Sequence, residues 1–149
     1  MRYRERLVPG PGTVVAVLLL APAVYIVVLP LRASPVVPLV LAAVVTAVAE
    51  ALLVLSAPVL SVEAGELRAG PARIPVAQTG PTESFRRDEA RTARGTGLDA
   101  RAFTLIRGWV DPVVRVALND PDDPAPYWLL STRRPDELRA ALAAEHASS

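Results

Sequence analysis

The 149-residue chain contains no cysteine, no lysine and a single histidine, His146, close to its C-terminus. Without cysteine there are no disulfides, thiolate zinc sites, iron–sulfur clusters or cysteine nucleophiles. All 16 basic residues are arginines, so Schiff-base chemistry and a P-loop ammonium group are excluded too. No nucleophile–base or metal-ligand pattern occurs, and His146 reads as a frayed surface residue. We therefore expect no metal, no cofactor and no enzymatic activity.

Apolar residues make up 52% of the chain and charged residues only 21%. Two runs account for this bias: residues 13–31 carry no charge, and residues 36–55 carry only Glu50. As a helix, each run is about 28–30 Å long, which matches a hydrocarbon core of roughly 30 Å. Because the connector is so short, the sequence predicts an antiparallel transmembrane hairpin over 13–55. A short arm, 1–12, precedes it, and a domain over 59–146 follows.

A secretory signal peptide is the alternative interpretation of the first run. Basic residues precede it, and Ala21-Pro22-Ala23 loosely resembles a small-residue cleavage site. The apolar run continues beyond that point, however, and a second one follows at once. We therefore favour the uncleaved hairpin.

The arginines beside the two spans predict the orientation of the hairpin. Five lie outside it, at positions 2, 4, 6, 68 and 73, whereas the connector has only Arg32. By the positive-inside rule, both termini are expected in the cytoplasm of a bacterial cell as parts of a multi-pass plasma-membrane protein.

Small residues recur in the second span at Ala43, Ala47 and Ala51. This four-residue spacing allows close helix packing in lipid, and Glu50 beside it is expected to face the first helix or another subunit. The carboxyl of Glu50 either extends to the nearby interface or serves as a proton-relay or ion site.

The distal part changes to a two-residue hydrophobic period, which is typical of half-buried strands. It predicts strands near 60–62, 67–69, 74–76, 103–106, 113–118 and 127–131. Helices are expected over 85–94, capped by Ser84, and over 135–144, where Leu138 and Leu142 form an apolar stripe. The predicted class is α+β: a transmembrane hairpin followed by a small antiparallel sheet or split barrel with a C-terminal helix.

Several short motifs resemble those of a known family. They are Tyr3-Arg4-Glu5-Arg6-Leu7, Gly65-Glu66-Leu67-Arg68-Ala69-Gly70, Trp109-Val110, Asp120-Pro121, Pro126-Tyr127-Trp128 and Ser131-Thr132-Arg133-Arg134-Pro135. The chain is similar in these to small two-helix membrane proteins of unknown function from high-GC Gram-positive bacteria. The order of short strands before one helix also resembles bacterial pleckstrin-homology-like domains. These resemblances imply location and organisation but no reaction.

The best candidate for anion or partner binding is Thr132, Arg133 and Arg134, directly before the last predicted helix. Backbone amides, a hydroxyl and two guanidinium groups there can converge on a phosphate. In the alternative, Thr132 caps the helix while the arginines are solvated or pair with Asp136 and Glu137. The acidic loop 120–123 lacks the glycine and glutamate of an EF-hand and reads as a rigid turn.

Residues 56–149 hold 12 arginines against 13 acidic residues, which argues against nucleic-acid binding. The leading hypothesis is a membrane-anchored cytosolic module that binds or scaffolds a protein or an anionic lipid headgroup. The alternative is an accessory subunit whose hairpin packs against a transporter or a membrane enzyme.

Overall fold

The computed structural model describes residues 3–31 and 34–148, which form two compact units. One unit is helical and runs from Val8 to Ala57. The other combines the chain up to Leu7 with everything from Pro58 onward. The arm before the first helix therefore belongs to the same unit as the distal part of the chain, whereas the sequence suggested a separate segment over 1–12.

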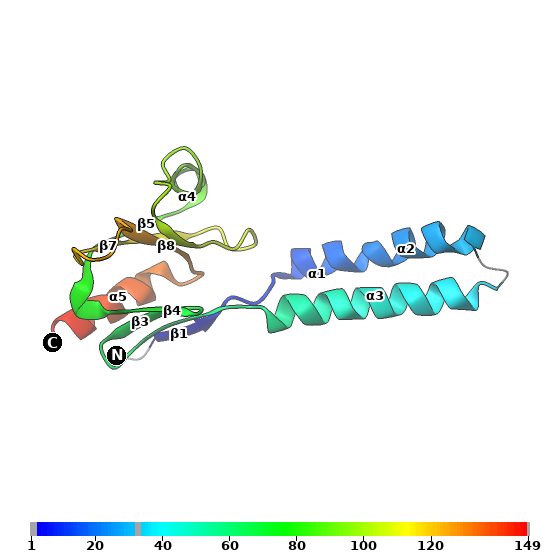
Figure 1. Cartoon of the computed structure of the whole chain (residues 1–149), viewed down its shortest axis with the longest axis horizontal. Coiled ribbons are helices and arrows are strands. Elements are labelled where there is room, and N and C mark those ends of the chain that lie inside the picture. Colours follow the sequence, from blue (N-terminus) through cyan, green and yellow to red (C-terminus); the bar gives the residue numbers. More distant parts are fainter. Residues whose placement is uncertain (1–2, 32–33, 149) are drawn as a thin grey trace. The chain divides into compact units, whose positions relative to one another are not determined.

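The helical unit consists of α1 (Pro11–Leu18), α2 (Leu20–Val28), the short 3₁₀ turn η1 (Leu29–Leu31) and α3 (Val36–Leu55). The first predicted helix is interrupted at Leu19 because Pro22 has no N–H to donate to the carbonyl of Leu18. α1 and α2 run alongside α3 (Figure 1). Both helical stretches, Pro11–Val28 and Val36–Leu55, are long and apolar enough to cross a membrane.

The first sheet is an antiparallel meander in the order β1-β2-β3-β4. Its strands are β1 (Tyr3–Arg6), β2 (Val59–Glu63), β3 (Glu66–Ala69) and β4 (Ala72–Pro75). The turn between β2 and β3 needs positive φ at Ala64 and Gly65, at 53° and 73°, which is typical of a tight hairpin turn. The three predicted strands are present here, and β1 is an addition: Tyr3 lies opposite Val62 of β2.

The second sheet has the order β5-β7-β8-β6, and β6 pairs in parallel with β8. Its strands are β5 (Thr79–Phe85), β6 (Phe103–Leu105), β7 (Val113–Leu118) and β8 (Tyr127–Ser131); the 3₁₀ turn η2 (Val76–Gln78) precedes β5. The sequence did not predict β5, because its register shifts between Thr79 and Thr82 and breaks the alternation. Helix α4 (Arg87–Arg94) consequently begins after Phe85, and Ser84 lies in the strand rather than at the helix cap.

Helix α5 (Pro135–His146) lies between the two sheets (Figure 1). Its predicted stripe is confirmed: Leu138 and Leu142 are buried in one core with residues of both sheets, such as Leu60 and Leu130. Against the opposite face of the second sheet, α4 packs the buried residues Ala90 and Ala93. The predicted α+β class with two apolar helices is thus confirmed.

Candidate functional site

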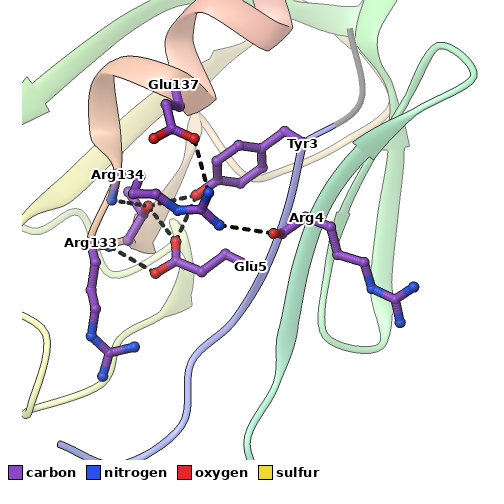
Figure 2. A network of polar contacts seen from close by, with 7 residues as sticks. Tyr3, Arg4, Glu5, Arg133, Arg134 and Glu137 are labelled. Atoms are coloured by element: carbon purple, nitrogen blue, oxygen red, sulfur yellow. Dashed lines mark hydrogen bonds and ion pairs between the residues drawn. The ribbon is translucent and has the colours of Figure 1, made fainter.

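The candidate site lies where β1 meets the loop that enters α5 (Figure 2). Strand alternation turns Tyr3, Glu5 and Leu7 toward the interior and leaves Arg4 and Arg6 exposed. Glu5 is only 6% exposed, and Thr132 is completely buried. A carboxylate thus lies among core residues, where an ionised group requires hydrogen-bond partners.

Glu5 receives hydrogen bonds from three groups. The hydroxyls of Tyr3 and Thr132 each donate to Oε2 at 2.6 Å, and the Arg133 amide donates to Oε1 at 3.1 Å. The Thr132 hydroxyl accepts in turn from the Arg134 amide at 3.0 Å, and it lies 2.8 Å from the Tyr3 hydroxyl. Bonds as short as those to Oε2 are typical of charge-assisted hydrogen bonds.

Arg134 closes the site from the solvent side. Its guanidinium donates to Glu137 and to the backbone carbonyl of Arg4, both at 2.9 Å. The same group lies 5.3 Å from the centre of the Tyr3 ring, within the range of a cation–π contact. Arg134, held in place by Glu137, therefore fastens β1 to the start of α5 through two interactions, with the Arg4 carbonyl and the Tyr3 ring.

The surroundings of Tyr3 shift its ionisation. Burial is the main cause and the hydrogen bond to Glu5 the next, and together they raise the pKa of the phenol far above its usual value. The bond from Thr132 and the charge of Arg134 oppose this rise only in part. Tyr3 is therefore a neutral donor over the whole physiological pH range.

Two of the three residues predicted to capture an anion do bind one, but it belongs to the chain itself. The Thr132 hydroxyl and the Arg133 amide bind the Glu5 carboxylate, while the Arg133 guanidinium points away from it (Figure 2). Arg134 pairs with Glu137, as the alternative interpretation expected. Capture of an external anion by these residues stays a prediction.

Thr132 does not cap α5, because the N-cap residue is Arg134 and no side chain caps this helix. Asp136 pairs with Arg86 at 2.8 Å and not with the arginines before the helix. Sequence reasoning missed the role of Glu5. The signal available was its position between Tyr3 and Leu7 in an alternating pattern.

The helical unit uses a different row of small residues from the one predicted. Ala43, Ala47 and Ala51 are exposed, whereas Ala42 and Thr46 are buried between the helices. Neighbouring positions differ by about 100° around a helix, so only one of the two rows can face α1 and α2.

Two polar atoms of α3 are buried without a hydrogen-bond partner among the described residues. They are Thr46 Oγ1 and Glu50 Oε1. The two side chains are four residues apart and therefore lie on the same face of the helix.

Among the residues that the structure describes, no group of three His, Asp or Glu side chains could hold a metal ion. His146 is exposed, as expected, yet it is not frayed. Its ring nitrogens lie 3.0 Å from the carbonyl oxygens of Leu142 and Thr79, so the imidazole connects the end of α5 to β5.

Comparison with family models gives one match, which covers residues 2–142 and is described as a protein of unknown function, DUF3093. The chain belongs to the DUF3093 family. The match includes β1, both apolar helices, both sheets and most of α5, so the family unit spans the hairpin and the β-rich unit together. No curated protein and no solved structure matched the chain.

Proposed function

We propose that this chain is an integral membrane protein whose helical hairpin anchors a binding or scaffolding module for a protein or anionic lipid partner. The length and apolar character of Pro11–Val28 and Val36–Leu55 support the anchor. The helical unit also exposes many large aliphatic side chains, among them Ile26, Val27 and Leu55, which lipid would cover.

The pairing of β1 with β2 carries the topological part of the proposal. β1 precedes the first apolar helix and β2 follows the second, and four residue pairs join them in one sheet. A sheet cannot form across a bilayer, so both ends of the hairpin belong on the same side. With the arginine distribution, this favours a bacterial plasma-membrane protein with both termini in the cytoplasm.

A second candidate function is an accessory subunit that packs through the hairpin against a transporter or membrane enzyme. Its support is the exposed row Ala43, Ala47 and Ala51. A small-residue row allows the close approach of another helix in lipid.

Topology can be tested directly because the chain has no cysteine of its own. Single variants Ser34→Cys, in the connector, and Ser148→Cys, after α5, would be treated in intact cells with a membrane-impermeant maleimide. We expect labelling at position 34 only, and labelling at both positions after the cells are opened. Labelling of Ser148→Cys in intact cells would contradict the proposed orientation.

Photocrosslinking of the full chain in its native membrane distinguishes the two functions. Crosslinkers at Arg133 and at Ala47, both on the surface of their units, would be compared. Capture through position 133 that is lost in Thr132→Val supports the binding module. Capture only through position 47, lost in Ala43→Leu, supports the accessory subunit.

A further inference from the structure

The outer face of the first sheet is rich in arginine. Arg4, Arg6, Arg68 and Arg73 all point away from the core and are exposed. Arg4 lies opposite Ser61, Ser61 opposite Arg68, and Arg68 opposite Arg73. One row of directly paired positions therefore crosses all four strands with three arginines and one serine.

The three arginines of this row outnumber the two glutamates, Glu63 and Glu66, that share the outer face of the sheet with them, so an excess of positive charge remains. Arg68 pairs with Glu66 at 3.4 Å, but both side chains are exposed and the contact is therefore weak. Arg4 and Arg73 form no ion pair with any residue in the described ranges. Like charges directly opposite each other destabilise a sheet, so an anion bound on this face would relieve an unfavourable arrangement.

Chain connectivity keeps this face close to the ends of the apolar helices. Four residues separate the end of β1 from the start of α1, and three separate the end of α3 from the start of β2. Because an extended residue covers at most about 3.5 Å, the ends of β1 and β2 stay within roughly 20 Å of the helices, whatever the orientation of the sheet. A hairpin in a bilayer thus holds this sheet within reach of the headgroups.

We propose that the arginine face, defined as Arg4, Arg6, Arg68 and Arg73, docks on the anionic headgroups of the membrane that holds the hairpin. This inference rests on the proposed membrane anchor. Strands are spaced by about 4.8 Å, so the row from Arg4 to Arg73 is roughly 15 Å wide. That width suits several neighbouring headgroups and exceeds a single phosphate. The charge is local to one face, which explains how a domain of nearly balanced charge binds an anionic surface.

The test uses the full chain in nanodiscs of phosphatidylcholine, with or without phosphatidylglycerol, and with a quencher attached to the lipid. A fluorophore on Ala64→Cys reports the end of β2 that is distant from the hairpin, so it approaches lipid only when the sheet lies on the surface. A second label on Val44→Cys in α3 reports insertion of the hairpin.

We expect quenching at position 64 to be stronger in anionic than in neutral nanodiscs and to decline with added salt. An arginine near an anionic surface contributes roughly fivefold to binding, so Arg68→Gln with Arg73→Gln lowers the docked-to-free ratio about thirtyfold. The matched control, Arg91→Gln with Arg139→Gln, removes the same charge from exposed positions on α4 and α5 and leaves quenching unchanged.

Equal quenching at position 64 in both kinds of nanodisc would overturn the inference. It would also be overturned if the control variant lost as much quenching as the variant of the arginine face, and an acidic protein would then be left as the ligand of this face. Competition by inorganic phosphate at constant ionic strength would overturn it in favour of a discrete phosphate site. If position 44 is quenched and position 64 does not respond to anionic lipid, the docking fails and the anchor stands. If position 44 is not quenched, both proposals fail.

Discussion

Substitution of Glu5 by alanine tests whether the buried carboxylate holds the N-terminal strand in place. The change removes the acceptor for the Tyr3 hydroxyl, the Thr132 hydroxyl and the Arg133 amide. Each bond to a charged group contributes about 1.5–3 kcal/mol. The two hydroxyls lie 2.8 Å apart and can bond each other, so the full sum is not lost. The net loss is then about two such bonds, and we expect a cost of about 3–5 kcal/mol in the free energy of unfolding.

Hydrogen exchange of the β1 amides measures this cost in the full chain. A tenfold change corresponds to about 1.4 kcal/mol, so Glu5→Ala should accelerate exchange by roughly two to four orders of magnitude. Glu63→Ala is the matched control, because Glu63 lies on the adjacent strand and is only partly buried. Exchange in Glu5→Ala within about threefold of the control would refute a structural role of the carboxylate.

Glu5→Gln separates charge from hydrogen bonding at the same site. The amide has one acceptor oxygen and one donor group, so it cannot accept from the Arg133 amide and from the two hydroxyls at once. One orientation places its NH₂ against the Arg133 N–H, and the other places it against the hydroxyls. We expect an exchange rate between those of the wild type and Glu5→Ala, and a wild-type rate would show that neither the charge nor the second acceptor matters.

Further predictions concern ionisation, the Thr132 hydroxyl and helix packing. Burial and Glu5 raise the pKa of Tyr3, so its contribution to stability is complete below about pH 10 and falls as the pH rises, because only the unfolded chain releases the proton. Tyr3→Phe should remove this alkaline loss in thermal unfolding. Thr132→Val should lower the free energy of unfolding by about 1–3 kcal/mol, and Thr104→Val, on an exposed position, by less than about 0.5 kcal/mol. In the hairpin, Ala42→Leu should disturb helix packing, as seen by a lower Tm in detergent, whereas Ala43→Leu should not.

Local patterns in the sequence were sufficient for elements whose partners are close along the chain. The alternation over 60–76 predicted β2, β3 and β4, which pair through tight turns. α5 was equally predictable, since the stripe of Leu138 and Leu142 and the proline at its start are local features. In both cases, the residues that determine the element lie within it.

β1 could not be predicted in the same way because its partner is far along the sequence. Tyr3 pairs with Val62, and the whole hairpin lies between them. The arginines of β1 can, moreover, be explained as charges that determine the orientation of the membrane spans. That explanation does not involve Tyr3 and Glu5, the residues of this strand that face the interior. A charged residue at a core position is a weak signal unless the donors that satisfy it are known, and here they come from Thr132 and Arg133.

The choice between two rows in α3 shows a different limit. Ala43, Ala47 and Ala51 repeat every four residues, and so do Pro38, Ala42 and Thr46. Small-residue spacing alone cannot rank them, because each row forms a continuous stripe on its own face. The structure places the second row inside, although it contains a threonine whose hydroxyl has no hydrogen-bond partner within residues 3–31 and 34–148.

β1 precedes the helical hairpin and β2 follows it, so the first sheet of the β-rich unit is complete only when the hairpin brings these two strands together. In a chain anchored as we propose, residues 3–6 cannot pair until residues 59–62 have been synthesised and lie on the same side of the membrane. A chain that inserted only one helix would place Glu5 on the opposite side from Thr132 and Arg133. The buried Thr132 hydroxyl and the Arg133 amide would then lose their acceptor, and Leu7 would leave the core. The cost of that wrong topology therefore exceeds the cost of Glu5→Ala, because it includes the same hydrogen bonds, the four residue pairs between β1 and β2, and the burial of Tyr3 and Leu7. Under the proposed membrane anchor, the Glu5 network thus favours the hairpin with both ends on one side, in addition to fastening a strand.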